Sequence, residues 1–221
     1  MADSAGARAI MVDSQLRTND VTDRAVLAAM ATTPREAFVP AAKRALAYLD
    51  KDIELNAAEA GGRVLMKPMV AGKLIQLAAI GPQDVVLDIG CGTGYSAAIL
   101  SRIAGSVVAL EADADLAAEA SERLVAIEAS NAAVVNAPHE AGLPKEGPYD
   151  AIVIEGAVDE VPEAILAQLK DGGRLVAIVG RGNSAKALCY TRSGDNFGVR
   201  MGFNASAPIL PGFARAPGFV F

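Results

Sequence analysis

From residue 84 onward, the chain alternates between short continuous apolar runs and segments with helical apolar spacing. Short apolar runs of this kind are typical of strands that are buried on both faces of a parallel sheet. The predicted strands cover 85–89, 106–111, 133–136, 150–155 and 173–179, and the predicted helices cover 94–103, 114–129 and 159–169. This alternation predicts an α/β fold with a doubly wound, mostly parallel sheet, whose ligand crevice lies at the carboxyl ends of the strands.

The residues before this alternation show helical spacing instead. Prolines mark the ends of these helices, because proline fits the first turn of a helix but not its interior. The predicted helices cover 20–31, 41–48 and 68–80, and 50–67 is predicted to be a loop. We therefore expect an N-terminal helical region over 1–82, joined to a core over 83–221 in one compact domain.

The C-terminal part departs from the strand–helix alternation. Beyond Gly182, short segments at 186–192 and 198–204 predict two strands that pair antiparallel. The segment 208–221 holds three prolines and three phenylalanines, which predicts an irregular tail whose aromatic rings pack into the core. The sheet is therefore expected to end in a small antiparallel part.

The most informative segment is 85–95, which reads Val-Val-Leu-Asp-Ile-Gly-Cys-Gly-Thr-Gly-Tyr. A strand, a glycine turn and a helix N-terminus form a site where the backbone comes close to a nucleotide-like ligand. The dinucleotide-binding fingerprint needs a third glycine where this chain has Tyr95. Glu111 ends the next predicted strand, 21 residues after Gly90, where a carboxylate can accept both ribose hydroxyls. The spacing Asp-x-Gly-x-Gly-x-Gly resembles motif I of class I S-adenosylmethionine (AdoMet)-dependent methyltransferases.

AdoMet is therefore the expected cofactor. The expected cofactor-binding residues lie in the glycine turn and at the ends of neighbouring strands: Asp88, Gly90, Cys91, Gly92, Gly94, Glu111, Asn136 and Glu155. Asp88 is placed to reach the amino group of the cofactor through the glycine turn or a water. Cys91 is interpreted as a small residue tolerated in a tight turn rather than as a nucleophile.

Composition narrows the class of partner. The chain has 221 residues, a formal net charge of −6 and a pI of about 4.9, so bulk attraction to nucleic acid or to an anionic membrane is not expected. No apolar run reaches membrane-spanning length and no signal layout is present, so we expect a cytoplasmic protein. His139 is the single histidine, and we interpret it as a solvated loop residue rather than a base, with no metal site expected.

Several further segments resemble protein-L-isoaspartate O-methyltransferases, over roughly residues 11–180. They are Met11-Val12-x-x-Gln15-Leu16-Arg17, Val26 to Met30, Pro34-Arg35-Glu36-x-Phe38-Val39-Pro40, Ala47 to Asp50, Pro148 to Val153, Val161-Pro162 and Gln168 to Val176. The resemblance implies a Rossmann-like methyltransferase core and transfer of a methyl group from AdoMet to the carboxylate of an isoaspartyl residue in a protein or peptide. A carboxylate acceptor is already ionised at pH 7 and needs no general base.

The chain departs from the family pattern at two places. The family carries Thr-Ile-Ser-x-Pro before the helix at 68–80, with the serine at the substrate carboxylate, whereas this chain has Met66 and Lys67 before Pro68. We take Met66 and Lys67 as the catalytic candidates at these substrate-loop positions, with Arg63 or backbone N–H groups as other candidates to orient the carboxylate. The family's Asp-Gly pair for the adenine is replaced by Asn136-Ala137, where Asn136 or Glu140 can substitute.

These departures leave three functions open. They are isoaspartyl methylation, methylation of another protein or of a small molecule, and AdoMet binding without catalysis. Two hypotheses also remain for the loop at 63–68. In the first, the loop binds the acceptor, and Met66→Ser raises activity. In the second, it is a packed connector in which Met66 fills an apolar gap. Arg35 and Glu36 are expected to form a structural ion pair or cap, and Glu119 with Arg123 a solvated helix pair.

Overall fold

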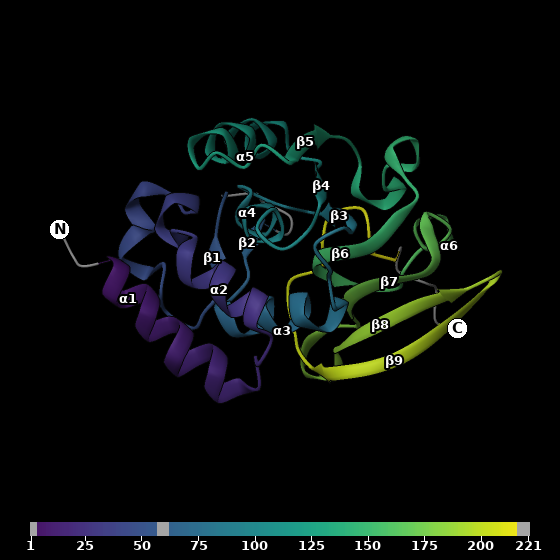
Figure 1. The fold of residues 1–221 in the computed structure, drawn as a ribbon, viewed down its shortest axis with the longest axis horizontal. Coiled ribbons are helices and arrows are strands. Elements are labelled where there is room, and N and C mark those ends of the chain that lie inside the picture. Colours follow the sequence, from purple (N-terminus) through teal and green to yellow (C-terminus); the bar gives the residue numbers. More distant parts are fainter. Residues whose placement is uncertain (1–3, 57–61, 216–221) are drawn as a thin grey trace, which may run out of the picture.

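A seven-stranded sheet forms the centre of the molecule, with the strand order β5-β4-β3-β6-β7-β8-β9 (Figure 1). The computed structural model describes residues 4–56 and 62–215. The strands of this sheet are β3 (Val85–Ile89), β4 (Ser106–Glu111), β5 (Ala132–Asn136), β6 (Tyr149–Val158), β7 (Leu169–Val179), β8 (Lys186–Ser193) and β9 (Asn196–Asn204). A separate two-stranded sheet pairs β1 (Ile53–Glu54) with β2 (Val64–Leu65).

The strand pairing confirms the doubly wound prediction. β3 pairs in parallel with β4 on one side and with β6 on the other, and the chain therefore reverses its winding direction at β3. β8 and β9 then add an antiparallel edge, as the sequence predicted. In open α/β sheets the ligand crevice lies at such a reversal, outside the carboxyl ends of the strands. The glycine turn that follows β3 lies there.

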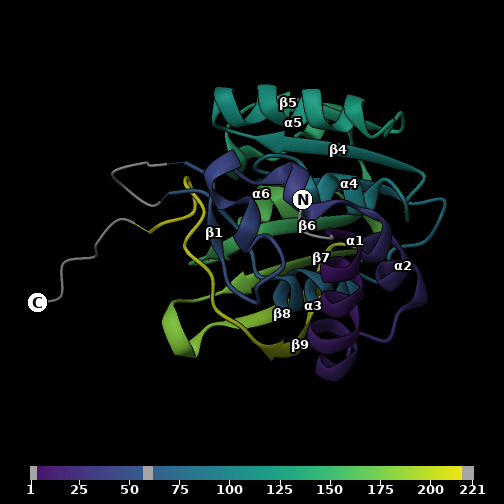
Figure 2. The same ribbon diagram turned by 90° about the vertical axis from the view of Figure 1, so that its left-hand side faces the viewer.

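Helices cover one face of the sheet more extensively than the other. The α-helices are α1 (Ser4–Met11), α2 (Arg24–Thr32), α3 (Pro68–Ala78), α4 (Tyr95–Leu100), α5 (Ala114–Ala126) and α6 (Glu163–Leu166). Shorter helical segments are the π-helical η1 (Val12–Leu16) and the 3-10 turns η2 (Arg17–Asn19), η3 (Arg35–Phe38), η4 (Ala41–Leu46), η5 (His139–Ala141), η6 (Pro144–Glu146) and η7 (Gly182–Ser184). The N-terminal helices and α3 to α5 share the larger apolar core. α6 and the segment around Leu210 and Phe213 close the other face, and Figure 2 shows the layers from the side.

Several predicted helices are shorter than the apolar spacing suggested. The helix expected over 159–169 is reduced to α6, because Pro162 stands before it and Leu169 already pairs with Tyr149 in the sheet. The helix expected over 94–103 ends at Leu100, and the one over 114–129 ends at Ala126. The segment 41–48 is the 3-10 turn η4, and the predicted loop 50–67 contains β1 and β2.

The C-terminal segment packs against the site end of the sheet. Leu210 is buried and its N–H donates to the carbonyl of Ala157, 2.8 Å away, and Phe213 is also buried. This agrees with the predicted irregular, packed tail, although Phe219 and Phe221 lie outside the described residues. In the part of the chain that the structure describes, no helix combines the length and apolar character needed to cross a membrane.

Candidate active site

The glycine turn after β3 adopts backbone conformations that require glycine. Gly90, Gly92 and Gly94 have φ angles of +80°, +56° and +92°, a region that other residues rarely adopt. A Cβ atom at Gly92 would lie 2.7 Å from Cδ1 of Leu55, and one at Gly94 would lie 3.2 Å from Cβ of Ala120. The three glycines therefore let the turn pass close to neighbouring segments that side chains would otherwise push away.

Glu111, at the end of β4, is the most heavily hydrogen-bonded carboxylate of the turn. Its Oε2 accepts from the Gly92 N–H at 2.7 Å and forms an ion pair with Nη2 of Arg63 at 3.1 Å, and its Oε1 accepts from the N–H groups of Ala112 and Asp113. Burial by itself raises the pKa of Glu111, but the hydrogen bond with His139 and the charge of Arg63 outweigh it and lower the pKa to about 2. Glu111 is therefore ionised and fixed in place.

The interpretation of His139 as a solvated loop residue is wrong. Its side chain is 1% exposed, with Nε2 3.1 Å from Oε1 of Glu111 and Nδ1 3.1 Å from the carbonyl oxygen of Pro211. The burial has a topological cause. β5 lies beside β4, so residues that follow β5 come close to the end of β4. The adjacency of two predicted strand ends was the signal in the sequence that could have placed His139 against Glu111.

A cavity of about 380 Å³ opens beside Glu111, at the carboxyl ends of β4 and β5. It is lined by Ala112, Asn136, Ala137, Pro138, Glu140, Pro211 and Gly212. Nδ2 of Asn136 donates to the carbonyls of Glu111 and Ala112 at 2.8 and 3.1 Å, which ties the two strand ends together. The two residues that the sequence offered for the adenine, Asn136 and Glu140, therefore both line this cavity.

Asp88 is completely buried on β3. Its Oδ2 accepts from the Ser96 hydroxyl at 2.6 Å, and its Oδ1 has no hydrogen-bond partner among the described residues. Burial raises the pKa of Asp88 to about 7, against the Ser96 hydrogen bond and with the added charge of Glu111. Cys91 is also buried, and burial raises the pKa of its thiol well above the usual range. A protonated, enclosed thiol agrees with Cys91 as a packing residue.

Arg63 lies across the glycine turn. Its Nη2 donates to the carbonyl of Gly90 at 2.5 Å in addition to the ion pair with Glu111. The arginine side chain is 6% exposed, and with Leu55 it covers the ends of β3 and β4. A ligand that binds Glu111 through Oε2 must therefore displace this guanidinium.

The connector before α3 is packed against the core. Met66 is 2% exposed and belongs to the larger apolar core, and its carbonyl accepts from Nη2 of Arg35 at 2.7 Å. Lys67 precedes α3, and its backbone N–H donates to Asp52. Lys67 also lines a second cavity of about 310 Å³ with Asn183 and Ser206. The buried position of Met66 favours the packed connector over a side chain that reaches the acceptor.

Arg35 and Glu36 both make contacts that hold the N-terminal region, but they do not pair with one another. Nε of Arg35 donates to the Ala47 carbonyl at 2.7 Å, and its guanidinium stacks on the ring of Tyr95, 4.9 Å from the ring centre. Glu36 accepts from the hydroxyl of Tyr48 and lies 3.9 Å from Nη1 of Arg8. The Glu119–Arg123 pair forms on α5 as predicted.

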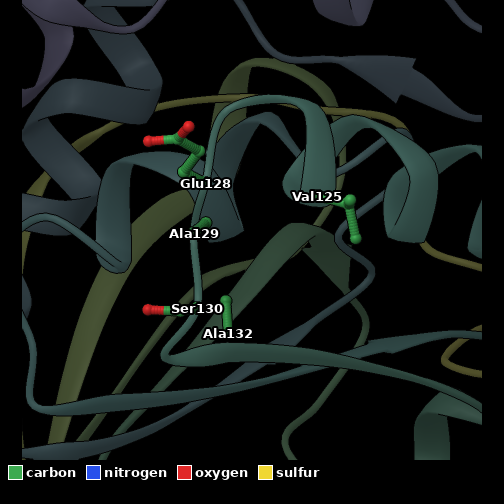
Figure 3. Close-up of a pocket in the computed structure, with 5 residues that line it drawn as sticks. All are labelled: Val125, Glu128, Ala129, Ser130 and Ala132. Atoms are coloured by element: carbon green, nitrogen blue, oxygen red, sulfur yellow. The ribbon is translucent and has the colours of Figure 1, made fainter.

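Another cavity, of about 590 Å³, lies on a different part of the surface (Figure 3). It is lined by Val125, Glu128, Ala129, Ser130 and Ala132, along the turn between α5 and β5. This turn is at the amino end of β5, whereas the glycine turn and Glu111 lie at the carboxyl ends of their strands. The cavity therefore lies at the opposite end of the strands from the candidate site.

Comparison with known proteins identifies the family. The model of the protein-L-isoaspartate(D-aspartate) O-methyltransferase family matches residues 8–204. The chain belongs to this family. The protein-L-isoaspartate O-methyltransferase of Methylorubrum extorquens is 39% identical, over 97% of this chain and 92% of that protein. The one from Koribacter versatilis is 39% identical, over 78% of this chain and 76% of that protein.

Solved structures of the family share the fold. One named protein-L-isoaspartate O-methyltransferase has a TM-score of 0.82 at 23% identity, and the match covers 93% of this chain and 66% of that chain. A second, from Plasmodium falciparum, has a TM-score of 0.77 at 17% identity and covers 92% of this chain and 97% of that one. The family member described here therefore has the family's sheet with its helical N-terminal region and its antiparallel edge.

Proposed function

We propose that this chain is an AdoMet-dependent carboxyl methyltransferase that acts on isoaspartyl residues of proteins or peptides. The observation that carries the proposal is the buried, ionised Glu111 at the glycine turn, next to the 380 Å³ cavity. An ionised carboxylate at the end of the second strand fits the two ribose hydroxyls, and the cavity fits the adenine. Relatives along nearly the whole chain are named for the isoaspartyl activity, and the Plasmodium falciparum structure is a complex with S-adenosyl-L-homocysteine.

The residues present fit the ammonium group, the ribose and the adenine of AdoMet. The orphaned Oδ1 of Asp88 is a buried acceptor that suits the cofactor's ammonium group, and Asn136 stands at the cavity proposed for the adenine. The glycines at 90, 92 and 94 open the backbone where a Cβ would crowd it. AdoMet, when bound, supplies an electrophilic methyl group on a sulfonium. The protein then has to hold the acceptor carboxylate in line and exclude water.

Transfer of labelled methyl groups tests the proposal. The wild-type chain is incubated with labelled AdoMet and either an isoaspartyl peptide or the same peptide with ordinary aspartate. We expect a base-labile methyl ester on the isoaspartyl peptide alone, and inhibition by S-adenosylhomocysteine. Calorimetry with AdoMet and with NADH accompanies the assay. Tight AdoMet binding without transfer would favour another acceptor or a non-catalytic role, and a preference for NADH would overturn the cofactor assignment.

A further inference from the structure

Four buried polar atoms near the ends of β3 and β6 have no hydrogen-bond partner within the described residues. They are Oδ1 of Asp88, Oε1 of Glu155, Nη1 of Arg35 and the hydroxyl of Tyr95. More than nine in ten buried polar groups in native proteins have a partner, so such a group needs an explanation. The proposed function uses Asp88 for the cofactor. The Arg35 and Tyr95 side chains lie against one another. Glu155, which the sequence placed among the expected cofactor-binding residues, has no role in the proposed function.

Glu155 lies on the same face of the sheet as Asp88. Asp88 pairs with Val153 across β3 and β6, and Glu155 is two residues farther along β6, towards its carboxyl end. The register of β6 against β7 shifts between Val153 and Ala157, so Glu155 stands in an irregularity of the strand. Irregularities of this kind often aim a side chain beside an active site. The Glu155 side chain is 8% exposed.

Arg35, from the N-terminal region, lies close enough to Glu155 for its charge to act on that carboxyl group. Two of its nitrogens are fixed by the carbonyls of Ala47 and Met66, and its planar group stacks on Tyr95. The guanidinium cannot turn without losing these contacts, so Nη1 is held as a preorganised donor. Because Arg35 binds the carbonyl of Met66, this donor adjoins the connector at 63–68 that the sequence assigned to the acceptor.

The charges around Glu155 decide its protonation. Burial and the charge of Asp88 raise the pKa of Glu155 well above its usual range, against the opposing charges of Arg63 and Arg35. Because burial favours the uncharged form of Glu155, its carboxyl group can act as an O–H hydrogen-bond donor. An ionised Glu155 would instead repel an anionic acceptor.

We propose that Glu155 binds the acceptor carboxylate together with Nη1 of Arg35. The inference rests on the proposed function and names the contacts of its acceptor. Glu155 donates to the carboxylate oxygen that does not react. A lone pair of the other oxygen forms the new O–CH₃ bond as the S–CH₃ bond breaks, and that electron pair stays on sulfur. The proton of Glu155 remains in place throughout.

Variants at 155 separate this role from its alternatives. Glu155→Ala removes the donor, whereas Glu155→Gln keeps an N–H donor of nearly the same shape. Glu163→Ala and Glu163→Gln, on the exposed surface of α6, are the matched controls. The measurements are kcat and KM for an isoaspartyl peptide between pH 6 and 9, the Kd for S-adenosylhomocysteine, and Tm.

We expect Glu155→Ala to raise the peptide KM about 10- to 100-fold, because a hydrogen bond to a charged group is lost. Glu155→Gln should restore KM to within about threefold. In the wild type, KM should rise at high pH as Glu155 ionises, and in Glu155→Gln it should not. The Kd for S-adenosylhomocysteine should stay unchanged in both variants.

Three results would overturn the inference. An unchanged KM in a folded Glu155→Ala variant would show that Glu155 does not contact the acceptor. A loss of kcat in Glu155→Gln equal to that in Glu155→Ala would show that it acts as a base. Weaker binding of S-adenosylhomocysteine in both Glu155 variants would instead show that Glu155 is a cofactor-binding residue. Failure of the wild type to methylate any isoaspartyl peptide would instead remove the proposed function, and this inference with it.

Discussion

Glu111 and Glu155 are two buried carboxyl groups at the carboxyl ends of strands in one sheet, yet their surroundings are opposite. Both oxygens of Glu111 accept hydrogen bonds, and one of them also forms an ion pair with Arg63. The pKa of Glu111 is lowered to about 2. Glu155 has an oxygen without a partner, and its pKa is raised. The comparison shows that burial alone does not set the role of a carboxyl group. Neighbouring donors stabilise the charged form of Glu111, whereas burial disfavours the charged form of Glu155.

The largest expected effect is on AdoMet binding at the glycine turn beside Glu111. Gly92→Val places a branched side chain at a φ of +56°, with its Cβ 2.7 Å from Leu55, and should weaken AdoMet binding at least about 100-fold. Gly182→Val is a matched control, because Gly182 has the same φ of +56° and nothing within 4 Å of the added Cβ. Calorimetry with AdoMet measures both. Equal losses in the two variants would indicate strain rather than a blocked ligand site.

The second largest effect is expected from removal of the Glu111 carboxylate. Glu111→Ala should weaken AdoMet binding about 10- to 100-fold, because a charge-assisted contact to the ribose is lost. The control is Glu119→Ala, which removes an exposed carboxylate of α5. The depressed pKa of Glu111 also contributes stability above about pH 4.5, which is lost as pH falls towards about 2. Between these pH values, the free energy of unfolding should therefore fall more steeply with decreasing pH in the wild type than in Glu111→Gln. The same slope in both proteins would contradict this.

The pKa of Asp88, raised to about 7, should make AdoMet affinity and stability depend on pH, with a smaller effect than the substitutions above. The ionised form suits the cofactor's ammonium group, so AdoMet affinity should rise about tenfold as pH increases from 6 to 8. Stability changes in the other direction, because the folded state holds a proton that the unfolded state releases, and it falls as pH rises through about 7. Asp88→Asn should flatten both curves. A wild-type affinity independent of pH would exclude this role for Asp88.

The smallest expected effect on rate concerns the connector. Met66→Ser should lower the free energy of unfolding by about 2 kcal/mol or more, because a core side chain is lost, and should change kcat/KM little. Met201→Ser, at a 47% exposed position, is the control. Lys67→Ala should raise the peptide KM by a few-fold through loss of one partly exposed charge. A clear rise of kcat/KM in Met66→Ser would instead revive the hypothesis that position 66 faces the acceptor.

The elements that position the cofactor residues could be predicted closely. β3 and β4 have the predicted bounds, because continuous apolar runs between polar residues specify strands buried on both faces. Segments whose structure depends on distant partners were predicted less well. The helix expected at 159–169 is reduced to α6 between irregular segments, and its last residue, Leu169, pairs with Tyr149 in the sheet. No local pattern in the sequence contains that pairing.

The sequence by itself determined the strand–helix alternation, the glycine turn and the acid after the second strand, because these depend on residues close together along the chain. The tertiary structure decided the state of each buried charge. It placed His139 and Arg63 against Glu111, and it brought the charge of Arg35 within range of Glu155. Protonation depends on solvent exclusion and on charges a few ångströms away. Such neighbours come from segments as far apart as 35 and 155, and only folding brings them together.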